Sequence, residues 1–307
     1  MKIIYSDDIF ALKDTVVALG NFDGVHIAHQ ALIQKAVAIA NANNLTSVVY
    51  TFSEHPKNFL GQSIKLLTTN NEKEMVFENM GVDVLVYQKP TAEFLKVLPE
   101  AFIKDLVIDK LGAKHVVVGE HYRFGAKAKG DCILLKHLAD KLGVVAHVEK
   151  LIFLDNNIIS SSAIRELLLN GDLQKANKLL GRNYSFNGNI VHGNHFGTEI
   201  GFPTANIYID NLKIIPKFGV YACKAVIDNI EYNSVVNIGV KPTIGSERPL
   251  IEAHIIGGSG NFYDKNAVIQ LCEFLREEKK FSNIAELKYQ IKIDVDFALE
   301  YFSNNFK

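Results

Sequence analysis

Short apolar runs rich in β-branched residues alternate with helical segments over the first 150 residues. The runs that predict strands are 15–19, 47–52, 82–87, 115–119 and 144–149, and the segments that predict helices are 29–42 and 131–143. Such alternation predicts a parallel sheet with covering helices. Ligands bind such sheets beyond the carboxyl ends of the strands, so the loop after residues 15–19 is the first candidate site.

The pattern changes after two short helical segments, 161–171 and 173–181, each of which ends in a glycine suited to a left-handed helix cap. Beyond Arg182, β-rich runs are separated by Gly, Asn and Pro turns. These runs lie at 184–193, 219–227, 232–239, 250–257 and 266–275. Runs of this kind predict an antiparallel barrel or sandwich.

The last segment, residues 283–302, has apolar positions at helical spacing and predicts a helix whose apolar face caps the barrel. These positions are Ile284, Leu287, Ile291, Val295, Ala298, Leu299 and Phe302. A chain of 307 residues exceeds the usual size of one core. We therefore expect an α/β domain with a parallel sheet at 1–183, followed by an antiparallel β-barrel domain with a C-terminal helix at 184–307.

Composition narrows the class of protein. With 48% hydrophobic and 22% charged residues, the chain is typical of a globular protein. The 33 basic and 34 acidic side chains nearly cancel, which predicts no global field for nucleic acid or an anionic membrane. The acidic start and the lack of a long apolar run predict neither a signal peptide nor a membrane span, so a cytoplasmic location is expected. Cys132, Cys223 and Cys272 are widely spaced and are interpreted as packing residues.

The loop GNFDGVHIAH at 20–29 holds two histidines, His26 and His29, between a strand and the start of a helix. Free N–H groups at a helix N-terminus bind anions, and histidines there can donate to the transition state of attack on a phosphate. The other residues that we expect to contact the nucleotide here are Gly20, Phe22, Asp23 and Gly24. A pair of ordinary loop histidines is the alternative.

The segment GFPTAN at 201–206 places Thr204 and Asn206 two residues apart. On an extended strand both side chains point to one side, where their oxygens can hold a hard cation such as Mg²⁺. The glycines Gly193, Gly197 and Gly201 offer flexible N–H groups for phosphates. An ordinary Gly-rich turn is the alternative.

These motifs resemble those of the prokaryotic bifunctional riboflavin kinase/FAD synthetases. The loop at 20–29 resembles G-x-F-D-G-V-H-x-G-H of the nucleotidyltransferase half, with Ala28 in place of a glycine. TFSEHP at 51–56 resembles T-F-x-P-H-P, and GFPTAN is among the most specific strings of the kinase half. The resemblance covers nearly the whole chain and implies a Rossmann-like nucleotidyltransferase domain before a riboflavin kinase barrel.

The resemblance also implies roles for further residues. VVVGEHYRFGAKAKGD at 116–131 would line the flavin with Tyr122 and Phe124, and His121 stands where Asp or Asn is usual. ISSSAIR at 159–165 is similar to I-S-S-T-x-I-R, in which Ser161, Ser162 and Arg165 would bind the outgoing phosphates. Strand-end aromatics and a helix cap beside a solvated arginine are the alternatives.

In the kinase half the resemblance extends over 219–226, 237–243, 251–256 and the LREEKKF segment. Glu252 matches the carboxylate that serves as general base on the ribityl 5′-hydroxyl. After it, Gly257 and Gly258 replace an Asp-Phe pair. A glutamate that simply faces solvent is the alternative.

The resemblance implies two reactions: phosphorylation of riboflavin by MgATP to FMN, and transfer of AMP from ATP to FMN, which gives FAD and pyrophosphate. ATP, riboflavin, FMN and Mg²⁺ are thus the expected substrates and cofactor, and nothing in the sequence indicates an oligomer. Three alternatives stay open. They are a riboflavin kinase with a degenerate adenylyltransferase domain, a non-catalytic flavin-binding protein, and a nucleotidyltransferase for another acceptor.

Overall fold

The computed structural model describes residues 1–154, 157–192, 197, 200–243, 246–258 and 261–305. The chain forms two compact units, Met1–Ser161 and Ser162–Lys307. The expected functional boundary after residue 183 stays a prediction, because the division by compactness falls at the start of the helical segments that precede the barrel. Each unit is described by itself.

The first unit is built on a six-stranded sheet in which every neighbouring pair is parallel. Its order is β1 (Lys2–Tyr5), β4 (Val84–Gln88), β3 (Thr46–Phe52), β2 (Thr15–Leu19), β5 (Ala113–Gly119) and β6 (Val145–Glu149). β2 and β4 are buried along their whole length, as expected for strands with both faces covered. The predicted parallel sheet is confirmed.

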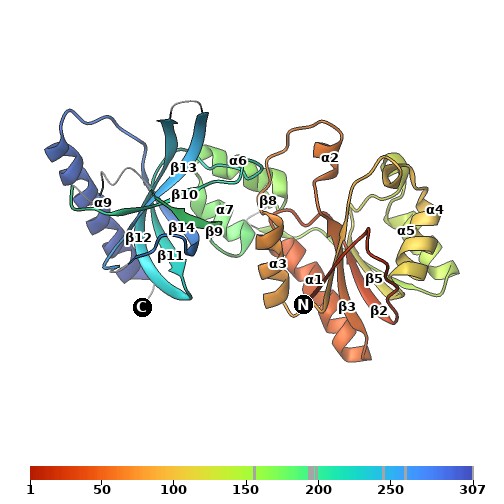
Figure 1. Cartoon of the computed structure of the whole chain (residues 1–307). Coiled ribbons are helices and arrows are strands. Elements are labelled where there is room, and N and C mark those ends of the chain that lie inside the picture. Colours follow the sequence, from red (N-terminus) through yellow and green to blue (C-terminus); the bar gives the residue numbers. More distant parts are fainter. Residues whose placement is uncertain (155–156, 193–196, 198–199, 244–245, 259–260, 306–307) are drawn as a thin grey trace. The chain divides into compact units, whose positions relative to one another are not determined.

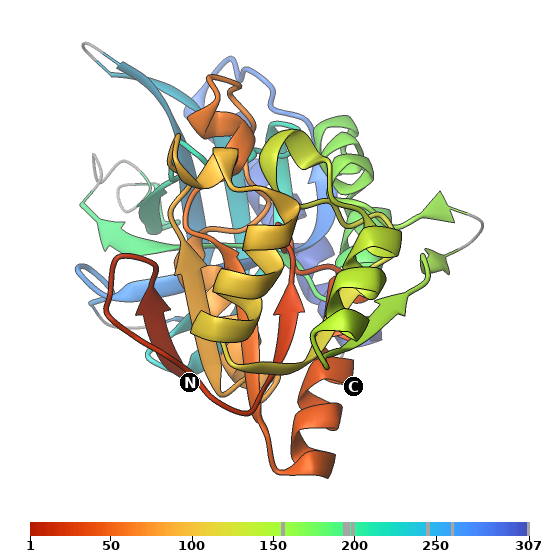
Figure 2. The same ribbon diagram turned by 90° about the vertical axis from the view of Figure 1, so that its right-hand side faces the viewer.

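Helices cover both faces of this sheet (Figures 1 and 2). On one face α1 (Ile27–Asn43) and α3 (Asn70–Asn79) bury residues such as Ile33 and Phe77 against alternate positions of the strands. On the other face, a π-helix (Phe102–Lys110) and α5 (Cys132–Lys141) bury Val107 and Leu135. The short elements are α2 (Pro56–Phe59), η1 (Phe94–Lys96), α4 (Pro99–Ala101), η3 (Ala126–Ala128), β7 (Phe153–Leu154) and β8 (Asn157–Ile158).

The direction in which successive strands are added to the sheet reverses at one point. From β2 the chain proceeds to β3 and β4 on one side, and it then crosses back to β5 on the other side of β2. The carboxyl ends of β2 and β5 therefore flank a topological switch point, where open α/β sheets bind their ligands. The loops that begin at Gly20 and Glu120 meet this position.

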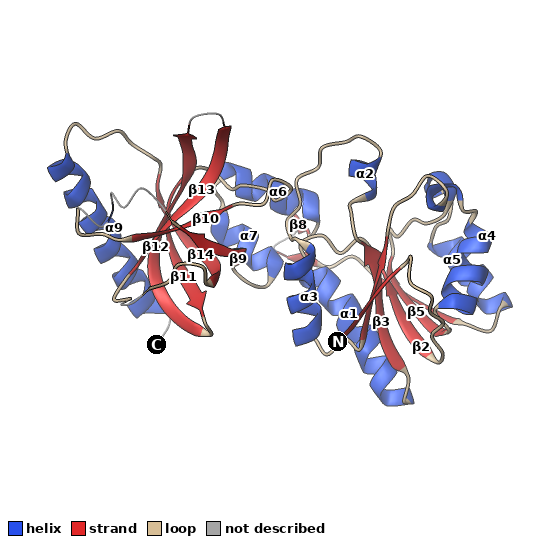
Figure 3. Ribbon diagram, in the orientation of Figure 1, coloured by secondary structure: helices blue, strands red, loops and turns tan. Residues whose placement is uncertain are grey.

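The second unit contains a closed antiparallel barrel (Figure 3). Its strands, in spatial order, are β10 (Thr204–Tyr208), β13 (Ser246–Ile255), β12 (Ile230–Thr243), β11 (Gly219–Ile227), β14 (Asn266–Arg276) and β9 (Tyr184–Val191). β9 pairs with β10 and closes the barrel. The predicted barrel is thus confirmed, and Cys223 and Cys272 lie buried in it.

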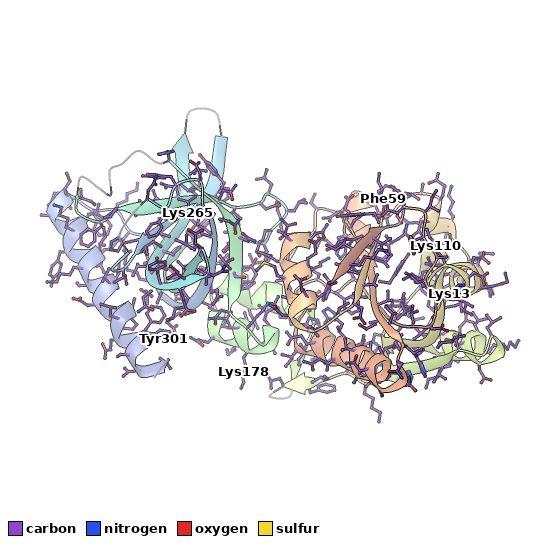
Figure 4. The ribbon with its side chains drawn as sticks, turned by 60° about the horizontal axis from the view of Figure 1, so that its bottom comes forward. Lys13, Phe59, Lys110, Lys178, Lys265 and Tyr301 are labelled. Carbon is purple, nitrogen blue, oxygen red and sulfur yellow. The ribbon has the colours of Figure 1, made fainter. Side chains whose placement is uncertain are left out.

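In the described part of the second unit, α6 (Ser161–Asn170), α7 (Leu173–Leu180) and α9 (Ile284–Asn305) accompany the barrel. α6 and α7 are the predicted pair, with Gly171 and Gly181 in the left-handed conformation. α9 covers the outer face of β11 and β12, where Ala298 and Phe302 pack. Tyr301, labelled in Figure 4, donates its hydroxyl hydrogen to the Cys272 carbonyl at 3.4 Å.

The capping face of α9 differs in part from the expectation. Ala298 and Phe302 are buried, but Ile284 and Leu299 are exposed although the apolar spacing assigned them to the same face. The buried place in the middle of the helix belongs to a charged residue, Asp294. None of the helices in the described part of the chain is long and apolar enough to cross a membrane.

Candidate functional site

The loop after β2 makes a tight turn before it enters α1. Phe22, Gly24 and Val25 all have positive φ angles, which are rare for residues with side chains. A Cβ at Gly20 would stand 2.7 Å from the Phe22 ring, which packs inward beside α1 and α3. The turn is therefore held by a buried aromatic ring, and Gly20 leaves the space for it.

Asp23 anchors this turn from within. Its carboxylate accepts hydrogen bonds from the backbone N–H groups of Leu67 at 3.0 Å and Thr68 at 3.2 Å. The Gly24 N–H donates to the Thr68 hydroxyl at 2.9 Å. These bonds tie the turn to the segment before α3. The predicted nucleotide contacts of Phe22, Asp23 and Gly24 stay predictions, and all three residues have structural tasks.

A buried lysine that the motifs did not indicate lies behind Asp23. Lys73 of α3 is 4% exposed. Burial lowers the pKa of its ammonium group, while the negative charge of Asp23 acts in the opposite direction. The Asp23 carboxylate therefore interacts electrostatically with the Lys73 ammonium group on the inner side of the turn. Lys73 comes from α3, a separate element of the first unit.

His26 and His29 meet at the N-terminus of α1. His26 caps the helix, and its Nδ1 accepts a hydrogen bond from the His29 N–H at 3.3 Å. The two rings stack with centroids 3.5 Å apart and 17° between their planes. An accepting Nδ1 assigns the proton of a neutral His26 ring to Nε2, which leaves that N–H as a donor. This arrangement suits the binding of an anion at the helix terminus.

Ser161, in the predicted phosphate-binding segment 159–165, contacts the same turn. Its hydroxyl donates to the Asp23 carbonyl oxygen at 2.8 Å. Ser162 and Arg165 follow in α6, on the far side of the division between the two units. Their contacts with the nucleotide stay predictions.

The segment after β5 supplies the two aromatic candidates. Tyr122 and Phe124 stack with centroids 5.9 Å apart, and Phe124 also contacts Phe102 at 5.4 Å. Phe124 is 4% exposed and belongs to the core, where the absence of a side chain at Gly130 makes room for its ring. Phe124 thus supports Tyr122 from beneath, and flavin contact by either residue stays a prediction.

The departures from the family motifs lie at exposed or half-buried positions. His121 is exposed in the turn after β5, and Ala28 is the second residue of α1. Gly257 follows β13 with a φ of +69°, and a Cβ at Gly258 would lie 2.6 Å from Ile255 Cγ2. The two glycines thus allow a tight turn after β13 that an Asp-Phe pair does not favour.

In the barrel, three polar residues form one row across neighbouring strands. Glu252 of β13 lies directly opposite Asn206 of β10 on one side and directly opposite Asn237 of β12 on the other. Residues opposite one another in antiparallel strands share a face, with Cβ atoms about 5 Å apart. Asn206, Glu252 and Asn237 therefore point to the same side of the barrel wall.

That side is the outer one. The next row, Ile207, Ile251 and Ile238, is at most 1% exposed and fills the interior of the barrel. Because side chains alternate along a strand, the polar row points outward, to the face that also carries α9. A site here is bounded by the barrel wall and by the segment that leads into α9.

Asn206 offers the clearest candidate for a ligand-binding oxygen. Its Oδ1 is buried, and no described residue donates a hydrogen bond to it. Buried polar oxygens are normally paired, so this oxygen is suited to bind a ligand. Thr204 lies on the same side of β10, and a Cβ at Gly197 would stand 3.1 Å from its hydroxyl oxygen. Two neutral oxygens beside a carboxylate fit the donor set of a hard cation such as Mg²⁺.

The glycines of the preceding loop have separate positions. The Gly197 carbonyl accepts a hydrogen bond from the Phe202 N–H at 2.8 Å, which closes the loop onto β10. Gly201 has a φ of +87° with open space around it. Gly193 lies outside the described residues. Phosphate contacts of these glycines stay predictions.

Two contacts around the row were not predicted from the sequence. The Asn237 amide donates to the Glu278 carboxylate at 3.1 Å, and His254 Nδ1 lies 3.0 Å from the Pro203 carbonyl oxygen. Each pair joins two motifs that are separate in the sequence. The first joins NIGVKPT to LREEKKF, and the second joins GFPTAN to IEAHII. The sequence feature that could have indicated these contacts is the repeated occurrence of polar residues inside β-rich motifs.

Comparisons with known proteins match both parts of the chain. The family model of FAD synthetase matches residues 9–163, and that of riboflavin kinase matches residues 180–302. The chain is 39% identical over 296 residues to the bifunctional riboflavin kinase/FMN adenylyltransferase of Bacillus subtilis, covering 94% of this chain and 93% of that protein. It is 32% identical over 290 residues to the enzyme of the same description from Escherichia coli K12, covering 94% and 92%.

A solved structure resembles the whole chain. It is the crystal structure of a Streptococcus pneumoniae protein described as a macrolide-efflux protein, with a TM-score of 0.88, 29% identity and complete coverage of both chains. The similarity extends over both units. The presence of both family models argues against a nucleotidyltransferase without a kinase half. On these matches, the chain belongs to the family of bifunctional riboflavin kinases/FMN adenylyltransferases.

Proposed function

We propose that the second unit phosphorylates riboflavin to FMN and that the first unit joins FMN to AMP from ATP, giving FAD and pyrophosphate. The observation that carries the proposal is the row of Asn206, Glu252 and Asn237 on the outer wall of the barrel, with a buried Asn206 oxygen that no described residue satisfies. Family membership supplies the identity of both substrates.

In the kinase reaction Glu252 takes the proton of the ribityl 5′-hydroxyl as that oxygen attacks the γ-phosphorus of ATP. The bond between the γ-phosphorus and the bridging oxygen breaks, and ADP leaves. Thr204 and Asn206 would hold Mg²⁺, which draws charge from the phosphate oxygens when it is bound. Asn237 is held by Glu278 and keeps a neutral amide beside Glu252. Gly193, Gly197 and Gly201 offer N–H groups to the phosphates.

In the adenylyl transfer a phosphate oxygen of FMN attacks the α-phosphorus of ATP, and the bond to the β-phosphate breaks. His26 and His29 donate to the oxygens of the transition state from the N-terminus of α1, so no covalent intermediate on the protein is needed. Ser161, Ser162 and Arg165 bind the departing pyrophosphate. Tyr122 packs against the flavin, with Phe124 beneath it.

The wider setting belongs to the same proposal. The substrates are small molecules, ATP among them, so we place the protein in the cytoplasm, where the two reactions can draw on the same ATP. Neither reaction requires nucleic acid or a membrane.

The test follows flavins by chromatography after the protein is mixed with riboflavin, ATP and Mg²⁺. The wild type should produce FMN first and FAD later. Glu252→Gln should reduce FMN formation by about 100-fold or more, because a general base is lost, and it should convert supplied FMN to FAD at the wild-type rate. Equal loss of both reactions would contradict the division of labour.

His29→Ala is the reciprocal variant. It should accumulate FMN and lower FAD formation by about 100-fold, the usual effect of one lost transition-state donor. Wild-type protein that makes FMN but no FAD, even from added FMN, would support the degenerate-adenylyltransferase alternative. No new flavin at all would support the flavin-binding protein. Circular dichroism of both variants controls for folding.

A further inference from the structure

The solvent face of α9 carries a row of large apolar side chains. Tyr289, Ile293 and Phe297 are 69%, 42% and 54% exposed. They are spaced four residues apart and so lie one turn above another along the helix. The opposite face, with Asp294 and Ala298, is the one that is buried on the barrel. The exposed row therefore contributes little to the packing of α9 onto its own barrel.

A second row of charged residues runs beside the first. Lys288, Lys292, Asp296 and Glu300 follow the same four-residue spacing, with both positive charges nearer the N-terminus and both negative charges nearer the C-terminus. In the described part of the chain, none of the four takes part in an ion pair. Lys288 repels Lys292 and Asp296 repels Glu300 across one turn of the helix. Lys292 and Asp296 are also one turn apart, but no ion pair joins them in the described structure.

The two rows are nearly symmetric about one point of the helix. Reversal of α9 about Ile293 exchanges Tyr289 with Phe297, and the charge row reverses about the adjacent residue, Asp294. An antiparallel copy of the helix would thus place Lys288 against Glu300 and Lys292 against Asp296, each twice. A parallel copy would place like charges together.

We propose that the solvent face of α9 binds a second copy of this chain, with the two α9 helices antiparallel about a two-fold axis near Ile293. A two-fold interface uses the same surface on both partners, which is what a self-complementary row provides. The opposed helix dipoles of an antiparallel pair add a favourable contribution. The charges fix the direction of the pair, and the apolar row supplies the contact between its helices.

The size of the face limits the strength of the association. The charged row spans about 18 Å, from the rise of 1.5 Å per residue, and a stable interface usually buries about 800 Å² on each partner. Three apolar side chains and four charges form a smaller surface than that. We therefore expect a dimer that forms at tens of micromolar protein, as an order of magnitude, and dissociates on dilution.

Sedimentation velocity of the full chain, from about 1 to 200 µM at low salt, tests the proposal. Two variants reverse half of the charge row each: Lys288→Glu with Lys292→Glu makes an acidic face, and Asp296→Lys with Glu300→Lys makes a basic one. Each variant alone should stay monomeric over this range. An equimolar mixture of the two should form a heterodimer whose dissociation constant is within about threefold of the wild-type value, since four opposite-charge pairs are restored.

Controls separate this face from other surfaces. Lys136→Glu with Lys141→Glu changes the net charge equally on exposed positions of α5 and should self-associate as the wild type does. Ile293→Glu should abolish the dimer, and circular dichroism should show that the helix of each variant remains. A wild type that stays monomeric at 200 µM, a dimer of either charge-reversed variant, or a mixture that does not pair would overturn the proposal.

Discussion

At the scale of single residues, His147 shows how one half-buried ring makes stability depend on pH. His147 of β6 faces His115 of β5, with 3.2 Å between Nε2 and Nδ1, and Lys35 of α1 is ion-paired with Glu149 beside it. Burial lowers the pKa of His147 below its usual 6.5, and His115 and Lys35 act in the same direction while Glu149 opposes them. Just below pH 6.5 this ring is therefore protonated to a smaller extent in the folded chain than in the unfolded chain.

The sign of the effect follows from proton binding. Between the lowered folded pKa and the unfolded value of about 6.5, the unfolded state binds more protons, so stability falls as the pH falls through this window. His147→Gln should flatten that acid loss in urea-unfolding midpoints measured from pH 8 to pH 5. His137→Gln, an exposed change on α5, should leave the slope as in the wild type. An unchanged slope in His147→Gln would show that other groups control it.

Single residues also show where sequence reasoning ends. His26 and His29 could be placed at a helix N-terminus because a strand, glycines and an apolar helix surround them in the sequence. The inward hydrogen bonds of Asp23 could not be predicted from the sequence, because its partners Leu67 and Thr68 lie more than forty residues away. The core position of Phe124 could not be predicted for a similar reason, because its neighbour Phe102 comes from a separate helix.

At the scale of elements, one buried ion pair joins β14 to α9. Arg276 Nε lies 2.9 Å from Asp294 Oδ1 and Nη2 lies 2.7 Å from Oδ2, and the Gln290 amide donates to the same carboxylate at 2.9 Å. Arg276 is the last residue of β14, and the segment between the two elements carries Glu278, which contacts Asn237 of the polar row. The pair therefore anchors one border of the proposed kinase site.

Arg276→Met should lower the free energy of unfolding of the second unit by about 3–5 kcal/mol, because it leaves the buried Asp294 carboxylate without its cation. Kinase activity should then be lost at a lower temperature than adenylylation of supplied FMN, as shown by residual activities after heating. The double change Arg276→Met with Asp294→Leu should recover much of the loss. Lys279→Met, on the exposed neighbouring segment, should change stability by less than about 0.5 kcal/mol.

Elements were predictable where their periodicity is local. Strands β2 to β6 and the helices α1, α5, α6 and α7 match apolar runs or glycine-terminated helical segments that can be read directly. The pairing of β9 with β10, and the register that aligns Asn206, Glu252 and Asn237, join residues separated by up to 46 positions. Such register depends on the closure of the whole barrel, and no local pattern records it.

At the scale of the whole molecule, the two proposed centres rest mainly on different units, although Ser162 and Arg165, the proposed pyrophosphate contacts, belong to the second unit. The polar row lies entirely in the second unit, and the stacked histidines with Ser161 lie entirely in the first. Each unit is compact with its own core, so the product of one site can in principle reach the other through solution. The expectation is two independent reactions linked by free FMN.

Complementation between two damaged chains tests this linkage. Glu252→Gln retains the adenylyl site and His29→Ala retains the kinase site, so neither variant alone should convert riboflavin to FAD. An equimolar mixture should do so at a steady rate close to that of wild type with the same concentration of intact sites, after a lag while FMN accumulates in solution. Excess unlabelled FMN should dilute label from riboflavin equally in the mixture and in the wild type. Stronger retention of label by the wild type would show instead that FMN passes within one chain, because only there are both intact sites on the same molecule.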